Sequence, residues 1–89
     1  MGFLPIPGEM YINDFPDKTC YSIYRNNDIV SKSDGLTNSD EDGKHIAFLY
    51  GTDVTAGDVI RSVNGKSYVV KHTDTDEYNG KPAIIKAYY

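Results

Sequence analysis

The sequence has little of what stabilises a small protein through covalent or metal cross-links. It contains a single cysteine, Cys20, and no tryptophan among its 89 residues. One thiol cannot form an intramolecular disulfide, and it leaves no Cys-x-x-Cys pair for zinc. No apolar run approaches the ~18 residues of a membrane span, and residues 1–10 lack the basic segment of a secretory leader. We therefore expect a soluble, unsecreted protein whose fold depends on its core or on neighbouring subunits.

Positive charge is also scarce in this chain. Nine Lys and Arg residues stand against thirteen Asp and Glu residues, which gives a formal net charge of −4. No global positive field attracts such a chain to nucleic acid or to anionic lipid, so sequence-specific DNA binding is not expected. The length allows one small domain. A domain of this size buries only about 60 to 65% of its unfolded surface, so a large internal active-site cavity would be costly.

Residues that could carry catalysis or bind a metal are few. Only His45, His72 and Cys20 could act as a base or a thiol nucleophile near neutral pH. Cys20 lies in an alternating segment that favours a buried or half-buried structural thiol, and neither histidine has a second ligand at metal spacing. Residues 38–43 match the opening of a calcium loop, but Leu49 stands where that loop requires a bidentate glutamate. The sequence therefore predicts no catalytic residue, no metal site and no cofactor, and we do not expect an enzyme.

Proline is concentrated at the start of the chain. Residues 1–18 contain three of the four prolines, and each proline removes a backbone donor and favours extended structure. We predict an extended N-terminal arm. Its apolar side chains are too many for an idle tail, so the arm is expected to pack on its own domain or on a neighbour. The candidate interface residues are Phe3, Ile6, Tyr11 and Phe15, together with Tyr88 near the other end of the chain.

Residues 19–89 have the pattern of a single all-β domain. Short runs rich in Tyr, Ile and Val alternate with turn residues, and these runs cover residues 19–25, 45–50, 58–63, 66–72 and 83–89. Asn64-Gly65 predicts a two-residue type I′ hairpin loop in which Val59 faces Val70. Apolar residues occur on both faces of that hairpin, as in a closed barrel or at a subunit contact. We expect a small antiparallel β-barrel or sandwich with SH3-like hairpins.

One long segment interrupts this pattern. Residues 31–44 contain only one strongly apolar side chain, Leu36, and they are rich in glycine and acidic residues. This composition predicts a long polar loop. The polar residues 73–77 are interpreted as a second, shorter connection.

The C-terminal part carries a pattern found in a known family. The elements of this pattern are, in order, Gly57-Asp58-Val59-Ile60, Asn64-Gly65-Lys66, Tyr68-Val69-Val70, Asp76-Glu77-Tyr78-Asn79-Gly80-Lys81-Pro82 and a last strand over residues 84–89. Over residues 52–89 this arrangement resembles the small head–tail connector proteins of long-tailed bacteriophages, which are the head-closure (stopper) and minor capsid-like proteins of the phage neck. The resemblance implies a small β-barrel with a long loop, assembled as a ring, and it carries no catalytic residue.

The resemblance also implies a function and partners. Such a ring joins the portal of the head to the tail and helps to retain packaged DNA, so the expected partners are further copies of the chain, a portal or adaptor protein, a tail-terminator protein and passing double-stranded DNA. The expected location is the virion, assembled in the host cytoplasm. The acidic residues Asp34, Asp40, Glu41 and Asp42 would suit a channel lining, because negative side chains repel DNA phosphates. Two alternatives remain open from the sequence: a small acidic phage-encoded inhibitor, and a generic SH3-like protein-binding module.

Overall fold

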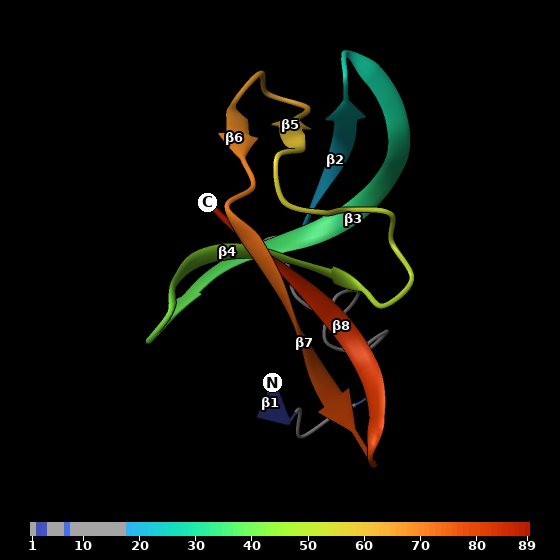
Figure 1. Ribbon diagram of the computed structural model, residues 1–89, viewed down its shortest axis with the longest axis vertical. Coiled ribbons are helices and arrows are strands. Elements are labelled where there is room, and N and C mark those ends of the chain that lie inside the picture. The colour runs from blue at the N-terminus through green and yellow to red at the C-terminus, as the bar shows by residue number, and fades with distance from the viewer. Residues whose placement is uncertain (1, 4–6, 8–17) are drawn as a thin grey trace.

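The computed structural model describes residues 2–3, 7 and 18–89, so the predicted contacts of Ile6, Tyr11 and Phe15 lie outside the described residues. The described residues form eight strands and no helix, which confirms the all-β prediction (Figure 1). In chain order these strands are β1 (Gly2–Phe3), β2 (Thr19–Arg25), β3 (Asp28–Asp40), β4 (Gly43–Leu49), β5 (Val59–Ser62), β6 (Ser67–Val69), β7 (His72–Tyr78) and β8 (Lys81–Tyr88). No helix in this part of the chain is long and apolar enough to cross a membrane.

All of these strands belong to one strongly curved sheet. Their order is β1-β7-β8-β4-β3-β2-β5-β6, and every neighbouring pair is antiparallel except β1 and β7. The sheet is not closed into a barrel. Strand β3 pairs first with β2 and then with β4, so it belongs to two parts of the fold (Figure 1). We call β2, β5, β6 and the first part of β3 the upper half, and β1, β4, β7, β8 and the last part of β3 the lower half.

The hydrophobic core lies between the two halves. Strand β2 contributes Tyr21 and Ile23, as its alternation predicts, and β4 contributes Ile46 and Phe48. The rings of Tyr21 and Phe48 meet edge to face, with their centroids 5.8 Å apart. The other buried members of this core are Val54, Ile60, Val70 and Ala87. Burial of both inner faces against each other resembles the packing of a small sandwich.

Gly35 allows β3 to pass from one half to the other. It is the last residue of β3 that pairs with β2, opposite Thr19, and its neighbour Leu36 is the first that pairs with β4. A Cβ at Gly35 would lie 2.8 Å from Cε1 of Phe48 and 2.9 Å from Cγ2 of Ile46. Since ordinary carbon contacts begin near 3.5 Å, only a residue without a side chain fits here.

The prediction of a long polar loop over residues 31–44 is wrong. Residues 28–40 form β3, and a two-residue turn at Glu41 and Asp42 leads directly into β4. The predicted connection over residues 73–77 is likewise part of β7. Both segments form strands although they are polar, because backbone hydrogen bonds to neighbouring strands hold them. Each carries few side chains that reach the core. Cys20 also differs from its prediction, since its side chain is exposed.

The hairpin turns agree with the sequence at two places and differ at a third. Asn26 and Asn27 have φ of 53° and 69°, while Asn79 and Gly80 have φ of 53° and 76°, as two-residue type I′ loops require. The Asn64-Gly65 hairpin instead has a three-residue loop, closed by a hydrogen bond from the Ser62 amide to the Lys66 carbonyl. Val59 therefore faces Val69 and not Val70. The register of this hairpin was predicted one residue out.

Candidate functional site

The face of the lower half that points away from the main core carries a compact set of polar side chains, several of them buried. The register places His45, Tyr88 and His72 opposite one another on β4, β8 and β7, with Lys86 and Asp76 on the same face of β8 and β7. Asp40 reaches this group from the end of β3. We call these six residues the polar cluster: Asp40, His45, His72, Asp76, Lys86 and Tyr88.

Asp40 and Lys86 are the charged centre of the polar cluster. Oδ2 of Asp40 accepts hydrogen bonds from the Tyr88 hydroxyl at 2.8 Å and from Nζ of Lys86 at 3.2 Å. Burial acts to raise the pKa of Asp40, but the hydrogen bonds from Tyr88 and Lys86 outweigh it and lower that pKa to about 2. Burial acts to lower the pKa of Lys86, yet its hydrogen bonds with Tyr88, Asp40 and Asp76 raise it above its usual range. Both groups are therefore charged near neutral pH.

His45 is the one member of the polar cluster with an unsatisfied buried atom. It is 3% exposed, and its Nδ1 has no hydrogen-bond partner among the described atoms. The nearest carboxylate oxygen, Oδ2 of Asp40, lies 3.7 Å away. Burial lowers the pKa of His45 more than the charge of Asp40 raises it, so the imidazole is neutral at pH 7. Its ring packs beside Tyr88, with centroids 5.1 Å apart.

The contacts of the polar cluster favour a structural role for it. The Asp40 carboxylate is engaged by two donors, Lys86 also pairs with Asp76 at 3.2 Å, and His45 is shielded from solvent. Each charge is thus held by another member of the cluster, and the end of β3 is fastened to β8. Tyr88 is 2% exposed and stacks on His72 with centroids 4.5 Å apart. The ring of Tyr88, one of the predicted interface residues, is thus covered within its own chain, and its contact with a neighbouring subunit stays a prediction.

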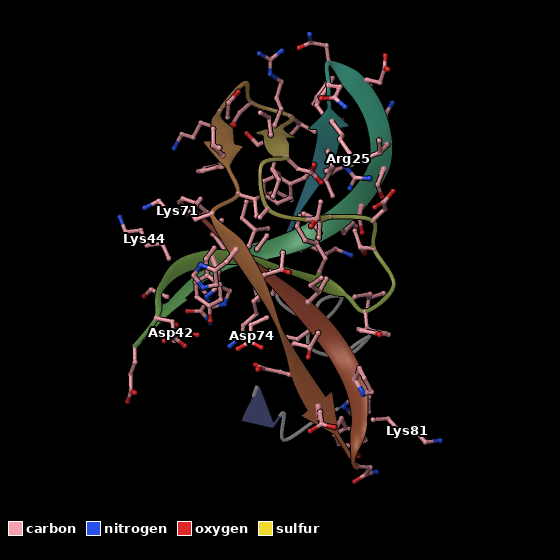
Figure 2. The ribbon with its side chains drawn as sticks, viewed as in Figure 1. Arg25, Asp42, Lys44, Lys71, Asp74 and Lys81 are labelled. Carbon is pink, nitrogen blue, oxygen red and sulfur yellow. The ribbon has the colours of Figure 1, made fainter. Side chains whose placement is uncertain are left out.

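The four predicted channel acids do not lie together. Asp34 lies in the upper half, on β3, where its carboxylate is 3.9 Å from Nζ of Lys18. Asp40 belongs to the polar cluster six residues further along β3, a separation of roughly 20 Å for extended chain. Glu41 and Asp42 are exposed in the β3–β4 turn, where the Asp42 amide donates to Oδ1 of Asp40 at 2.9 Å (Figure 2). We call Glu41 and Asp42 the hairpin tip.

Phe3 is the one arm residue of the predicted interface that the structure places in a strand. It belongs to β1, which runs parallel to β7 with Phe3 opposite Glu77. This strand occupies one edge of the sheet, and β6 occupies the other. The backbone position of Phe3 therefore lies at a sheet edge.

The outer face of the upper half carries an apolar surface. Tyr24 pairs with Ile29 on β3 and with Val59 on β5, and Val59 pairs with Val69 on β6. These four side chains therefore stand next to one another across four strands, and we call them the apolar row. Ile29 is 48% exposed and Val69 is 61% exposed. Three of the four large hydrophobic residues exposed in the described part of the chain lie in or beside this row: Ile29, Val69 and Val63 in the turn after β5.

A groove and two cations border the apolar row. The groove has a volume of about 360 Å³ and is lined by Tyr24, Asn26, Asn27, Gly57, Val59 and Arg61. Arg61 stands beside Ser22 of β2, and Ser22 in turn stands beside Lys32 of β3. The next row across the same face thus ends in one guanidinium and one ammonium group. Such an arrangement of an apolar strip with a charged rim is typical of a protein-binding surface.

A partly buried ion pair between Arg25 and Asp58 holds one wall of this groove. Arg25 donates from Nε to Oδ1 of Asp58 at 3.0 Å and from Nη2 to Oδ2 at 2.9 Å (Figure 2). Asp58 is 1% exposed and also accepts from the Thr55 amide at 2.9 Å. The hydrogen bonds from Arg25 are the main reason that the pKa of Asp58 is lowered. This clamp fixes the segment before β5, so that Gly57 keeps its place in the groove.

The sequence indicated this surface only in part. Apolar residues on both faces of residues 58–72 suggested a subunit contact, but Tyr24 and Ile29 were not among the predicted interface residues. They join the surface only because β2 pairs with β5, a contact between segments far apart in the chain. The sequence matches no protein-family model, and neither a curated protein nor a solved structure shows significant similarity to the chain.

Proposed function

We propose that this chain is a structural assembly protein that forms a homo-oligomeric ring in the neck of a bacteriophage. In this role the ring joins the portal of the head to the tail and helps to retain packaged DNA in the virion. The observation that supports the proposal is the apolar row with its groove. Among the described residues, Tyr50 and Val63 are the only exposed large hydrophobic side chains besides Ile29 and Val69 of this row, and exposed apolar surfaces mark sites of protein contact.

The size and charge of the chain are consistent with this role. A domain of 89 residues has a thin core, so covering the apolar row with a neighbour adds burial that the monomer lacks. A net charge of −4 lets duplex DNA pass without adhering to the ring. The resemblance of residues 52–89 to head–tail connector proteins supplies the biological setting.

The alternative of an acidic inhibitor receives less support from the geometry. A protein that mimics DNA has to present its carboxylates together and unpaired. Here Asp58 is buried against Arg25, Asp40 is held by Lys86 and Tyr88, and Asp34 lies beside Lys18. These acids are turned to contacts within the chain.

Native mass spectrometry across a concentration series tests the proposal, with and without a candidate portal or adaptor ring. We expect a discrete ring, formed alone or on the portal. Val69→Ser should weaken assembly, whereas Tyr50→Ser should not, because Tyr50 is 56% exposed but is not part of the apolar row. A chain that stays monomeric at every concentration, with and without those rings, would overturn the proposal.

A further inference from the structure

We propose that the apolar row receives the hairpin tip of a second copy of this chain, with Glu41 and Asp42 of one copy paired to Lys32 and Arg61 of the next. This inference rests on the assembly function proposed above and names the partner of the same surface. It follows from the charges at the two surfaces, from the preorganised shape of the tip and from their positions in the molecule.

The rim of the apolar row offers two positive groups. Lys32 and Arg61 are both exposed, and neither forms an ion pair within the described residues. The one side-chain hydrogen bond of Arg61 is a long contact of 3.4 Å from Nε to Oγ of Ser67. Asp34, an acid further along β3, has Lys18 nearby. In a chain that is negative as a whole, this face presents unpaired positive charge beside apolar area.

The hairpin tip offers the matching negative groups in a fixed shape. Glu41 and Asp42 form a two-residue turn between Asp40 and Gly43, which pair with each other. The Asp42 amide is tied to Asp40, and Asp40 is tied to Lys86 and Tyr88. Because the polar cluster anchors the turn, the backbone of the tip has little conformational entropy left to lose on binding. The polar cluster then supports assembly as well as stabilising a single copy.

The two surfaces lie at different places on the molecule. The apolar row crosses the upper half, whereas the hairpin tip projects from the side of the lower half (Figure 1). A contact between two different surfaces is heterologous, so in a pair of copies one copy keeps a free hairpin tip and the other keeps a free apolar row. Repetition of such a contact produces a closed ring or an open filament. A ring is the outcome that the proposed function requires.

Charge reversal at each surface tests this pairing. The groove variant is Lys32→Glu with Arg61→Glu, and the tip variant is Glu41→Lys with Asp42→Lys. Each variant alone brings like charges together at the contact, so we expect assembly at least about tenfold weaker than in the wild type. An equimolar mixture of the two should assemble again, because each variant then meets a partner of opposite charge at both of its surfaces.

A matched control repeats the change in net charge of the groove variant at positions outside the contact. Lys71→Glu with Lys81→Glu alters two exposed lysines outside both surfaces (Figure 2), and this variant should assemble like the wild type. Circular dichroism melting checks that all three variants fold. The measurement is native mass spectrometry under the conditions in which the wild type assembles.

Three results would contradict the inference, and one of them also contradicts the function. Groove and tip variants that assemble like the wild type would overturn the pairing while leaving a ring-forming protein. A groove variant that loses binding to a short DNA duplex but assembles normally would assign the two cations to nucleic acid instead. A wild-type chain that never assembles, alone or on a portal ring, would overturn the proposed function itself.

Discussion

Replacing Gly35 by alanine should destabilise the fold, although the change adds a single methyl group. The added Cβ would lie 2.8 Å from Cε1 of Phe48, 2.9 Å from Cγ2 of Ile46 and 3.0 Å from Cδ2 of Tyr21. All three atoms belong to buried side chains of the main core. None of them is the far end of an exposed chain that could turn away into solvent, so the core or β3 has to shift.

The size of the effect can be estimated from two opposing contributions. Overpacking a well-filled core costs about 1–3 kcal/mol. Alanine also restricts the unfolded chain more than glycine does, which stabilises by about 0.4–1 kcal/mol. The three contacts at 3.0 Å or less favour the upper part of the overpacking range, so we expect a net loss of about 1–2 kcal/mol in the free energy of unfolding. For a domain of this length such a loss lowers the melting temperature by about 4–16 °C.

Urea denaturation and thermal melting measure this loss, and a second substitution tests its cause. Phe48→Leu removes the ring atom nearest to the new methyl group, so Gly35→Ala should cost less in that background than in the wild type. Both single variants and the double variant complete the cycle. A wild-type melting temperature for Gly35→Ala, or an unchanged cost beside Leu at position 48, would refute the packing argument.

Three further predictions concern other described residues. The pKa of His45 is lowered from 6.5 in the fold, so the unfolded chain binds the proton more readily and stability falls as the pH drops below 6.5. His45→Gln should therefore flatten the pH dependence of the urea midpoint between about pH 7 and pH 5. An equal slope in both proteins would count against this prediction. Asp58→Ala removes the acceptor of the Thr55 amide and of Nε of Arg25, while Nη2 of Arg25 keeps its hydrogen bond to Asp53. We expect a loss of about 1–3 kcal/mol of unfolding free energy, measured by urea denaturation. A midpoint within error of the wild type would contradict this. Cys20 is exposed and should react fully with a thiol reagent in the native protein, at the rate found in urea; strong protection would show that its side chain is covered.

The strands that alternate in hydrophobicity could be predicted from the sequence, and the polar strands could not. Tyr21 and Ile23 of β2 are buried because alternate residues of a half-buried strand face the core. Strand β3 has only Leu36 as a strongly apolar residue in residues 31–40, so its composition is that of a loop. It is a strand because both of its edges are paired, over different parts of its length. Composition alone does not contain that information.

Turn chemistry was a better guide at one Asn-Gly than at the other. Asn79-Gly80 forms the expected two-residue loop, whereas Asn64-Gly65 lies in a three-residue loop. In the second hairpin the side chain of Asn64 contacts the Ser62 hydroxyl, and Gly65 has φ of 91°. A one-residue change of register exchanges the faces of a strand. In this hairpin burial selects the register, since Ile60 has to lie in the core.

The candidate surface depended on pairings that are distant in sequence. The apolar row exists because Tyr24 pairs with Val59, and because a bulge next to Ile23 brings Ile29 opposite Tyr24. Neither the bulge nor the long-range pairing can be recognised from the order of the residues. The sequence therefore places the predicted interface on the apolar N-terminal arm. It groups the acidic residues only because they are close together in the chain.

Strand β3 also connects the two proposed contact surfaces. A straight strand of its thirteen residues would span about 40 Å, which exceeds the longest dimension of the molecule, 36 Å. The strand is therefore bent, and the close approach at Gly35 marks where its pairing changes. Ile29 lies near its first end and the hairpin tip follows its last residue. In an assembled ring the bend of β3 would then set the rotation from one subunit to the next, so the curvature of a single strand would determine how many copies close the circle.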